Sequence, residues 1–379
     1  MTKSADVLII GAGIVGAACA FELSREKFSV AVVDANGIGL GATAAGMGHI
    51  VVMDDSEAQF QLTRFSQELW RTLAPQLPVD CEYRECGTLW VAANDEEMSE
   101  VQRKHREYAK HSVVTEVLDS RQLSQAEPHL RTSLAGALLV PNDAVLYPPC
   151  AASYFCHQAQ TFGATLHLGR RVESAGKGTI RLSDGTTLAA KTIINAAGEL
   201  APHLTPRVAI RPRKGHLVIT DRYPGLVRHQ LVELGYLKSA HSSYGDSVAF
   251  NVQPRPTGQL LIGSSRQYGT PDNTPDNRVE ADMISRMMQR ALEYLPALGN
   301  TSAIRSWTGF RAATPDKLPL IGPYPDDQSL FLAAGHEGLG ITTSLATARL
   351  VADHLLSRKS EIPAEPYRPP RQFAESVHV

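Results

Sequence analysis

The chain has 379 residues, of which 43% are hydrophobic, and its formal net charge is −2. This length exceeds that of one small domain, so we expect two lobes with a sizeable core. The charge is near zero and lysine and arginine form no block, so a nucleic-acid partner is not expected.

The cysteines and the apolar runs bear on metal binding, on the cellular compartment and on membrane insertion. The five cysteines lack paired C-x-x-C spacing, so we expect no metal site, and a reducing cytoplasm suits the chain. The longest uncharged run, Val7 to Phe21, is shorter than the roughly 18 residues that span a bilayer, and it contains three glycines. Neither a transmembrane segment nor a signal peptide is therefore expected.

The first sixty residues begin with a pattern typical of a βαβ unit. Residues 6–10 and 28–33 read as apolar strands, and residues 17–24 read as a helix between them. The turn after the first strand is G-A-G-I-V-G at 11–16, and the second strand ends in Asp34. This context turns a weak G-x-G-x-x-G match into a strong indication of dinucleotide binding.

Each glycine of this turn has a physical task. Gly11 permits the tight turn, Gly13 lets a pyrophosphate approach the backbone, and Gly16 lets the helix lie close to the strand. Asp34 would then accept hydrogen bonds from the ribose hydroxyls. The alternative is a glycine-rich turn that binds no ligand.

A run of small residues follows at 37–49, with no charge apart from the titratable His49. A segment so poor in side chains suggests backbone that lies against a flat ligand. A nucleotide lobe for NAD alone has no evident need of this run, so it favours FAD.

Further helices and strands follow from hydrophobic periodicity. Helices are expected at 57–73, 96–111, 150–162, 280–295 and 341–357. Strands are expected at 87–92, 165–168, 191–196, 213–220, 247–252, 259–263 and 330–334, with a hairpin turn at 183–186. The expected fold class is α/β with mixed α+β character, and the methionines of 280–295 read as core packing.

Five separated segments resemble, in this order, the D-amino-acid oxidase (DAO) family of FAD-dependent oxidoreductases. They are G-A-G-I-V-G with Asp34, INAAGELAP at 194–202, RPRKGHLVI at 211–219, WTGFRAATPDKLPLIG at 307–322 and AAGHEGLGITTSLATARLVADHL at 333–355. Within the family, TAAGMGHIVVMDD at 43–55 and GHEGLGITT at 335–343 resemble the FAD-bearing β subunit of D-hydroxyproline dehydrogenase, opine oxidase and hydrogen cyanide synthase type enzymes.

The resemblance implies two interleaved lobes, like those of glycine oxidase. A Rossmann-type FAD-binding lobe is expected at 1–83, 147–210 and 302–369. A mostly antiparallel substrate-binding lobe is expected at 84–146 and 211–301, with a flexible tail at 370–379.

The resemblance also implies a non-covalent FAD and the residues that contact it. These are Gly11, Ala12, Gly13, Ile14, Val15, Gly16, Asp34, Ala35, Gly41, Ala42, Thr43, Ala45, Gly46, Met47, Gly48, His49, Val172, Ala196, Ala197, Gly198, Gly335, His336, Glu337, Gly338, Leu339, Gly340, Ile341 and Thr342.

Arg311 is a guanidinium in an otherwise apolar stretch, so an enclosed Arg311 must find an anion. The resemblance places it, as a catalytic and substrate-binding residue, on the substrate carboxylate, where two parallel N–H···O bonds would orient an amino acid. The alternative is a buried ion pair with an aspartate or glutamate of the protein.

Four further residues are candidates for the site. His49, as a catalytic residue, and His336, as a substrate-binding residue, lie in segments expected to touch the flavin; a histidine held only by backbone hydrogen bonds is the alternative for each. Tyr244 and Phe250 are candidates for the substrate pocket, and plain core packing is the alternative for both.

The resemblance implies oxidation of a D- or secondary amino acid to an imine by hydride transfer from the α-carbon to flavin N5. No dedicated base is needed if the bound amine is already neutral. The expected role is the catalytic subunit of a D-hydroxyproline or other D-amino-acid dehydrogenase, in the cytoplasm or peripheral to the inner membrane through partner subunits that carry electron-transfer cofactors. The alternatives are a stand-alone oxidase that uses oxygen and an inactive FAD-carrying structural subunit.

Overall fold

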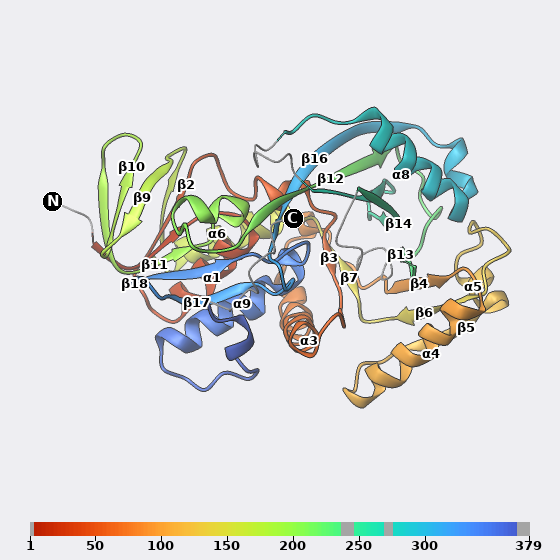
Figure 1. The fold of residues 1–379 in the computed structure, drawn as a ribbon, viewed down its shortest axis with the longest axis horizontal. Helices are drawn as coiled ribbons and strands as arrows, with labels where there is room; N and C mark the ends of the chain where they lie inside the picture. Colours follow the sequence, from red (N-terminus) through yellow and green to blue (C-terminus); the bar gives the residue numbers. More distant parts are fainter. Residues whose placement is uncertain (1–3, 236–245, 269–275, 370–379) are drawn as a thin grey trace, which may run out of the picture. The chain divides into compact units, whose positions relative to one another are not determined.

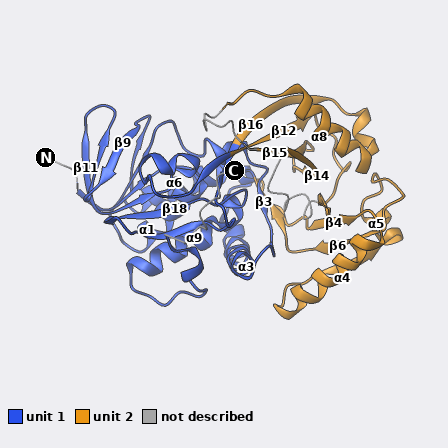
Figure 2. Cartoon of the chain, in the orientation of Figure 1, with its two compact units in different colours: residues 1–81, 147–212, 310–379 blue, residues 82–146, 213–309 orange. Residues whose placement is uncertain are grey.

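The computed structural model describes residues 4–235, 246–268 and 276–369. The chain forms two compact units, coloured separately in Figure 2. Unit 1 comprises Met1–Cys81, Tyr147–Pro212 and Phe310–Val379, and unit 2 comprises Glu82–Leu146 and Arg213–Gly309. Each unit is therefore assembled from segments that lie far apart in the sequence.

Unit 1 contains a sheet with strand order β17-β18-β11-β1-β2-β8. The strands are β1 (Ser4–Ile10), β2 (Val30–Asp34), β8 (Thr165–Leu168), β11 (Thr187–Asn195), β17 (Leu320–Tyr324) and β18 (Asp327–Ala334), and β9 (Val172–Gly176) and β10 (Thr179–Leu182) extend the sheet from β11. The pairs from β8 to β18 are parallel, and β17 is antiparallel to β18. The central strands are apolar runs because a parallel sheet is buried on both faces.

Helices cover this sheet (Figure 1). They are α1 (Ile14–Arg25), α2 (Ala42–Ala45), α3 (Glu57–Leu73), α6 (Pro148–Thr161) and α9 (Gly340–Leu355). Helix α1 packs against α6 and α9, and α9 also packs against α3. Local signals set two of the starts: the Ser56 hydroxyl accepts from Gln59 N at the start of α3, and α6 begins at Pro148.

Unit 2 contains a sheet with strand order β16-β12-β15-β14-β13-β4-β6-β5. The strands are β4 (Thr88–Ala92), β5 (Glu116–Asp119), β6 (Gly136–Val140), β12 (Arg211–Thr220), β13 (Gln230–Glu233), β14 (Ser247–Pro254), β15 (Leu260–Tyr268) and β16 (Ala303–Ala313). The helices are α4 (Asp95–Lys110), α5 (Ser120–Ala126) and α8 (Ala281–Tyr294), and α8 packs on β14 and β15. Apart from the parallel pair β4 and β13, the described strand pairings of this sheet are antiparallel.

Short elements complete the described chain. The two-residue strands β3 (His49–Ile50) and β7 (Ala144–Val145) lie in connecting segments. Single 3-10 turns occur at Ala74–Gln76, Val79–Cys81, Gly198–His203, Pro296–Asn300 and Glu365–Tyr367. No helix in the described ranges is long and apolar enough to cross a membrane.

The mixed α/β fold class and most expected elements are confirmed. The periodicity does not predict α2, α5, β3, β5, β6, β7, β9, β13, β16 and β17, which the structure adds. Strand β13 shows why, because its four residues, Gln230 to Glu233, are all buried although two of them are polar. Burial of polar side chains is a tertiary property that an apolar pattern does not reveal.

Candidate functional site

The turn between β1 and α1 is compact enough to require glycine. Gly11 has φ +107°, and a Cβ added there would lie 2.6 Å from the Ala196 carbonyl oxygen. A Cβ on Gly16 would lie 1.9 Å from the Gly11 carbonyl oxygen. The turn therefore has the close backbone packing that the glycine spacing predicts.

Asp34 stands at the carboxyl end of β2, beside this turn. Its Oδ2 accepts a hydrogen bond from Ala12 N at 2.8 Å, and its Oδ1 accepts one from Asn36 N at 2.8 Å. Its carbonyl oxygen accepts from Arg170 N at 2.9 Å, which brings the segment leading to Val172 next to it. The carboxylate is thus fixed at the sheet edge where doubly wound folds bind nucleotides.

The amino end of α1 is held by a neighbouring segment. Its N-cap Gly13 offers no side chain, and Ile14 N instead donates to Thr43 Oγ1 at 2.9 Å. Thr43 belongs to α2, so the small-residue run lies against the first turn of α1. A helix start with a glycine N-cap lets an anion such as pyrophosphate approach the positive end of the helix dipole.

The turn after β11 completes this sheet edge. Ala196 N donates to Ile10 O at 2.9 Å, and Ala197 N donates to Asn195 Oδ1 at 3.2 Å. The Asn195 amide nitrogen donates to Ala201 O at 3.0 Å. Asn195 is not among the residues predicted for the site, although an amide at the end of an apolar strand is the signal that identifies it.

The start of α9 is tied to the small-residue run and to α3. Thr342 Oγ1 donates to His49 O at 2.8 Å, and a Cβ on Gly46 would lie 2.8 Å from Ile341 Cδ1. Trp70 Nε1 on α3 donates to the carbonyl oxygens of Ile341 and Thr342 at 3.2 and 3.1 Å. The spacing of Trp70 predicts only packing, so this hydrogen-bonding role is an addition from the structure.

In unit 1 His336 is buried, and His49 is half-buried with its Nε2 atom enclosed. Burial lowers the pKa of each imidazole to about 3. His49 Nε2 is buried without a hydrogen-bond partner, whereas His336 Nε2 lies 3.0 Å from Thr347 Oγ1. Both rings are therefore neutral at physiological pH.

Arg311, near the end of β16, lies beside the loop before α9. A Cβ on Gly338 would be 3.4 Å from Arg311 Nε, and the next residue, Ala312, accepts a hydrogen bond from Glu337 N at 3.0 Å. The same loop carries His336. The Arg311 guanidinium therefore lies next to the loop before α9, whose residues are predicted to contact the cofactor.

Unit 1 thus gathers most of the predicted cofactor contacts into five segments, at 11–16, 34–35, 41–49, 196–198 and 335–342. The predicted contacts that lie in these segments and are not described above are Val15, Ala35, Gly41, Ala42, Ala45, Met47, Gly48, Gly198, Gly335, Leu339 and Gly340. Three observations fit an FAD: a glycine turn without room for a Cβ, a helix start whose N-cap is a glycine beside a fixed carboxylate, and the unpartnered His49 Nε2. Among the described residues, no group of three or more His, Cys, Asp or Glu could hold a metal ion.

The two aromatic pocket candidates have different outcomes. Phe250 is fully buried in the core of unit 2, where its ring stacks on Tyr294 with centroids 4.6 Å apart. The expectation of a pocket role for Phe250 is therefore wrong, because the alternation of β14 turns this side chain toward α8. Tyr244 lies outside the described residues.

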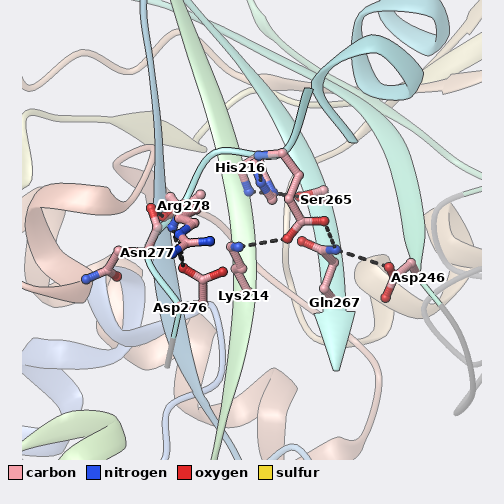
Figure 3. Close-up of polar contacts among 10 residues, drawn as sticks. Lys214, His216, Asp246, Ser265, Gln267, Asp276, Asn277 and Arg278 are labelled. Carbon is pink, nitrogen blue, oxygen red and sulfur yellow. Dashed lines mark hydrogen bonds and ion pairs between the residues drawn. The ribbon is translucent and has the colours of Figure 1, made fainter. Parts of the chain in front are cut away.

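Unit 2 also contains a polar cluster that the sequence does not predict (Figure 3). Lys214 Nζ donates to Glu280 Oε1 at 2.8 Å, and Gln267 Nε2 donates to Glu280 Oε2 at 2.8 Å. Glu280 N donates to His216 Nε2 at 3.2 Å, and His216 Nδ1 lies 3.0 Å from Ser265 Oγ. The Lys214 and Gln267 hydrogen bonds lower the pKa of the Glu280 carboxyl. These contacts join the start of α8 to β12 and β15.

Comparisons with known proteins agree along the whole chain. A family model described as FAD dependent oxidoreductase, abbreviated DAO, matches residues 6–354. Glycine oxidase of Geobacillus kaustophilus is 29% identical over 374 residues, which cover 95% of this chain and 94% of that protein. Hydrogen cyanide synthase subunit HcnC of Pseudomonas aeruginosa is 27% identical over 93% of this chain and 92% of its own. The crystal structure of the Geobacillus glycine oxidase matches with a TM-score of 0.87 at 28% identity, over 98% of this chain and 100% of that one.

Proposed function

Because this chain belongs to the DAO family of FAD-dependent oxidoreductases, we propose that it is the catalytic subunit of a D-hydroxyproline or other D-amino-acid dehydrogenase. It is an FAD-dependent enzyme that acts on the carbon–nitrogen bond of amino acids. FAD, when bound, supplies the acceptor for the two electrons that leave this bond. The proposed product is the imine of a D- or secondary amino acid.

The position of Arg311 carries the proposal. Its side chain lies against Gly338, in the loop that leads into α9. A planar guanidinium binds both oxygens of a carboxylate in parallel and so fixes location and orientation together. In this proposal Arg311 holds the substrate carboxylate and thereby directs the α-carbon.

The two histidines act without taking a proton. A base with a pKa of about 3 is poorly matched to proton transfer near neutral pH. We therefore assign His49 and His336 to hydrogen bonding and to the exclusion of water, and the substrate amine loses its proton before the reaction.

The first turn of α9 has a separate electrostatic task. Its amino end lacks a side-chain cap and carries the positive end of the helix dipole. Trp70 holds this turn in place through the Ile341 and Thr342 carbonyl oxygens. In this proposal the N–H groups of the turn stabilise negative charge that develops on the reduced cofactor.

The central experiment is anaerobic bleaching of the flavin absorbance by D-, L- and N-alkyl amino acids, with cis-4-hydroxy-D-proline included. We expect Arg311→Lys to raise the substrate concentration for half-maximal bleaching by about tenfold to a hundredfold, because at least one charge-assisted hydrogen bond is lost. The flavin spectrum should remain intact. Arg305→Lys, an exposed position of the same strand, is the control.

Two results would count against this function. Loss of bound flavin in Arg311→Lys would mark Arg311 as a structural residue. Failure of every amino acid to bleach the wild-type flavin would instead favour an inactive FAD-carrying subunit. A second candidate, an oxidase that uses oxygen, is favoured by the likeness to glycine oxidase.

A further inference from the structure

The indole of Trp70, on α3, is bound to the backbone of the first turn of α9. Its Nε1 atom donates to Ile341 O at 3.2 Å and to Thr342 O at 3.1 Å. Trp70 is fully buried, and its ring packs on Phe155 with centroids 5.5 Å apart. A buried indole N–H almost always has a partner, but here the acceptors are carbonyl groups that already belong to a helix.

A second side chain of α3 contacts the backbone of α9 one turn further along. Ala346 N donates to Ser66 Oγ at 3.1 Å, and Ser66 is fully buried. Ser66 and Trp70 are four residues apart, so they lie on the same face of α3. In a regular helix the N–H of residue 346 bonds the carbonyl oxygen of residue 342. Helix α3 therefore supplies a donor to that oxygen and an acceptor to that N–H.

The Trp70 hydrogen bond acts on a peptide group at the amino end of α9. The Ile341 carbonyl and the Thr342 N–H are parts of one peptide unit. The first N–H groups of a helix have no acceptor inside that helix, and the Thr342 N–H is the third in α9, which begins at Gly340. A donor on the carbonyl oxygen polarises the unit, so its N–H becomes a stronger donor.

The same turn adjoins the run of small residues for which contact with the flavin is predicted. Thr342 Oγ1 donates to His49 O at 2.8 Å and accepts from Val51 N at 3.3 Å. A Cβ on Gly46 would lie 2.8 Å from Ile341 Cδ1. The first turn of α9 is therefore held from two sides, by α3 and by residues 46–51.

We propose that Trp70 is a positioning residue that raises the reduction potential of the bound FAD. It acts through α9, because its N–H holds the first turn and strengthens the Thr342 N–H as a donor toward the negative charge of reduced flavin. Stabilisation of the reduced form makes reduction more favourable, so the potential rises. The inference rests on the proposed function, in which the amino end of α9 faces the flavin.

The test is a potential measurement on the FAD-loaded full chain, by dithionite reduction in equilibrium with a reference dye. Trp70→Phe keeps an aromatic ring and removes the N–H. We expect its equilibrium constant for flavin reduction to fall by about threefold to tenfold, which for two electrons is about 15–30 mV toward lower potential. Benzothienylalanine at position 70, in which sulfur replaces the N–H, keeps the shape of the indole and should give the same shift even if Trp70→Phe does not retain FAD.

Two variants separate this role from a structural one. Ser66→Ala removes the hydroxyl that accepts from Ala346 N, so its Tm should fall about as far as that of Trp70→Phe, while its potential stays that of the wild type. Trp90→Phe changes a buried tryptophan of unit 2 whose Nε1 has no hydrogen-bond partner, and it should leave the potential unchanged too.

The outcomes distinguish the inference from the proposed function. An unchanged potential with Phe or benzothienylalanine at position 70 would overturn the inference. An equal downward shift in Ser66→Ala would overturn it as well, because general loosening of α9 would then be the cause. Dithionite reduction needs no amino acid, so the potential still tests the inference where no amino acid bleaches the flavin and the proposed function fails.

Discussion

At the scale of single residues, burial sets the charge of the two histidines in the site. His49 and His336 have pKa values of about 3, against 6.5 for a solvated imidazole, and desolvation is the cause. In the unfolded chain both rings accept a proton below about pH 6.5, but in the folded chain they do so only near pH 3. The unfolded state thus binds more protons in this window, and acid favours unfolding.

We therefore expect the free energy of unfolding to fall as the pH decreases from 6.5 toward 3. Each histidine should contribute a loss of about 1.4 kcal/mol per pH unit, or about 2 kcal/mol by pH 5. Urea unfolding at several pH values measures this slope. His336→Asn should remove the contribution of His336 to this pH dependence of the free energy of unfolding. His129→Asn, at an exposed position, is the control. An unchanged slope in His336→Asn would show that the imidazole of His336 does not contribute to the loss of stability in acid.

At the scale of elements, the β1–α1 turn depends on backbone contacts that leave no room for a side chain. A Cβ on Gly11 would lie 2.6 Å from the Ala196 carbonyl oxygen, and φ at Gly11 is +107°. Gly169 also has a positive φ, +70°, but no atom lies within 4 Å of its added Cβ. An alanine would therefore strain the backbone at both positions, but only at Gly11 would its Cβ also collide with a neighbouring segment.

We expect Gly11→Ala to destabilise the chain by about 1–3 kcal/mol more than Gly169→Ala, because overpacking adds to the strain. Displacement of the Ala196 turn should also reduce the FAD content of purified Gly11→Ala. Thermal unfolding and flavin absorbance per chain measure the two effects. Equal stability and equal FAD content in both variants would place the nucleotide away from this turn.

At the scale of the whole molecule, the electrons taken from the substrate must leave the chain. Among the described residues, no cluster of cysteine, histidine or acidic side chains could hold a metal centre for onward transfer. One relative, HcnC, is by its name a subunit of hydrogen cyanide synthase. Under the proposed function, these electrons pass to a partner subunit or to a quinone-type acceptor.

We expect enzyme reduced anaerobically by substrate to regain its flavin absorbance slowly in air and rapidly with a quinone or dye acceptor. The recovery rate and the peroxide released after air is admitted measure the two routes. A buffer-only sample corrects for background peroxide. Rapid recovery with one peroxide per substrate would identify an oxidase instead.

Much of the nucleotide-binding unit follows from local pattern. The turn at 11–16, the strand ending at Asp34 and the helix after Gly340 are each encoded by residues that are neighbours in the chain, and the structure has them where the pattern predicts them. Strand β13 escapes prediction because its burial is imposed by strands from distant segments. Trp70 and Asn195 were not predicted as hydrogen-bonding residues, since their partners are set by tertiary contacts.

The sequence alone determined the nucleotide-binding unit, because glycine spacing and apolar periodicity act over a few residues. The family, the FAD and the carboxylate-binding candidate Arg311 follow from the resemblance of five segments of the sequence. Only the tertiary structure decided that Phe250 packs in the core and that the polar side chains of β13 are buried between β4 and β14. The physical reason is register: which side chains stand together on a sheet face depends on the alignment of strands from different parts of the chain, and a shift of one residue reverses the face.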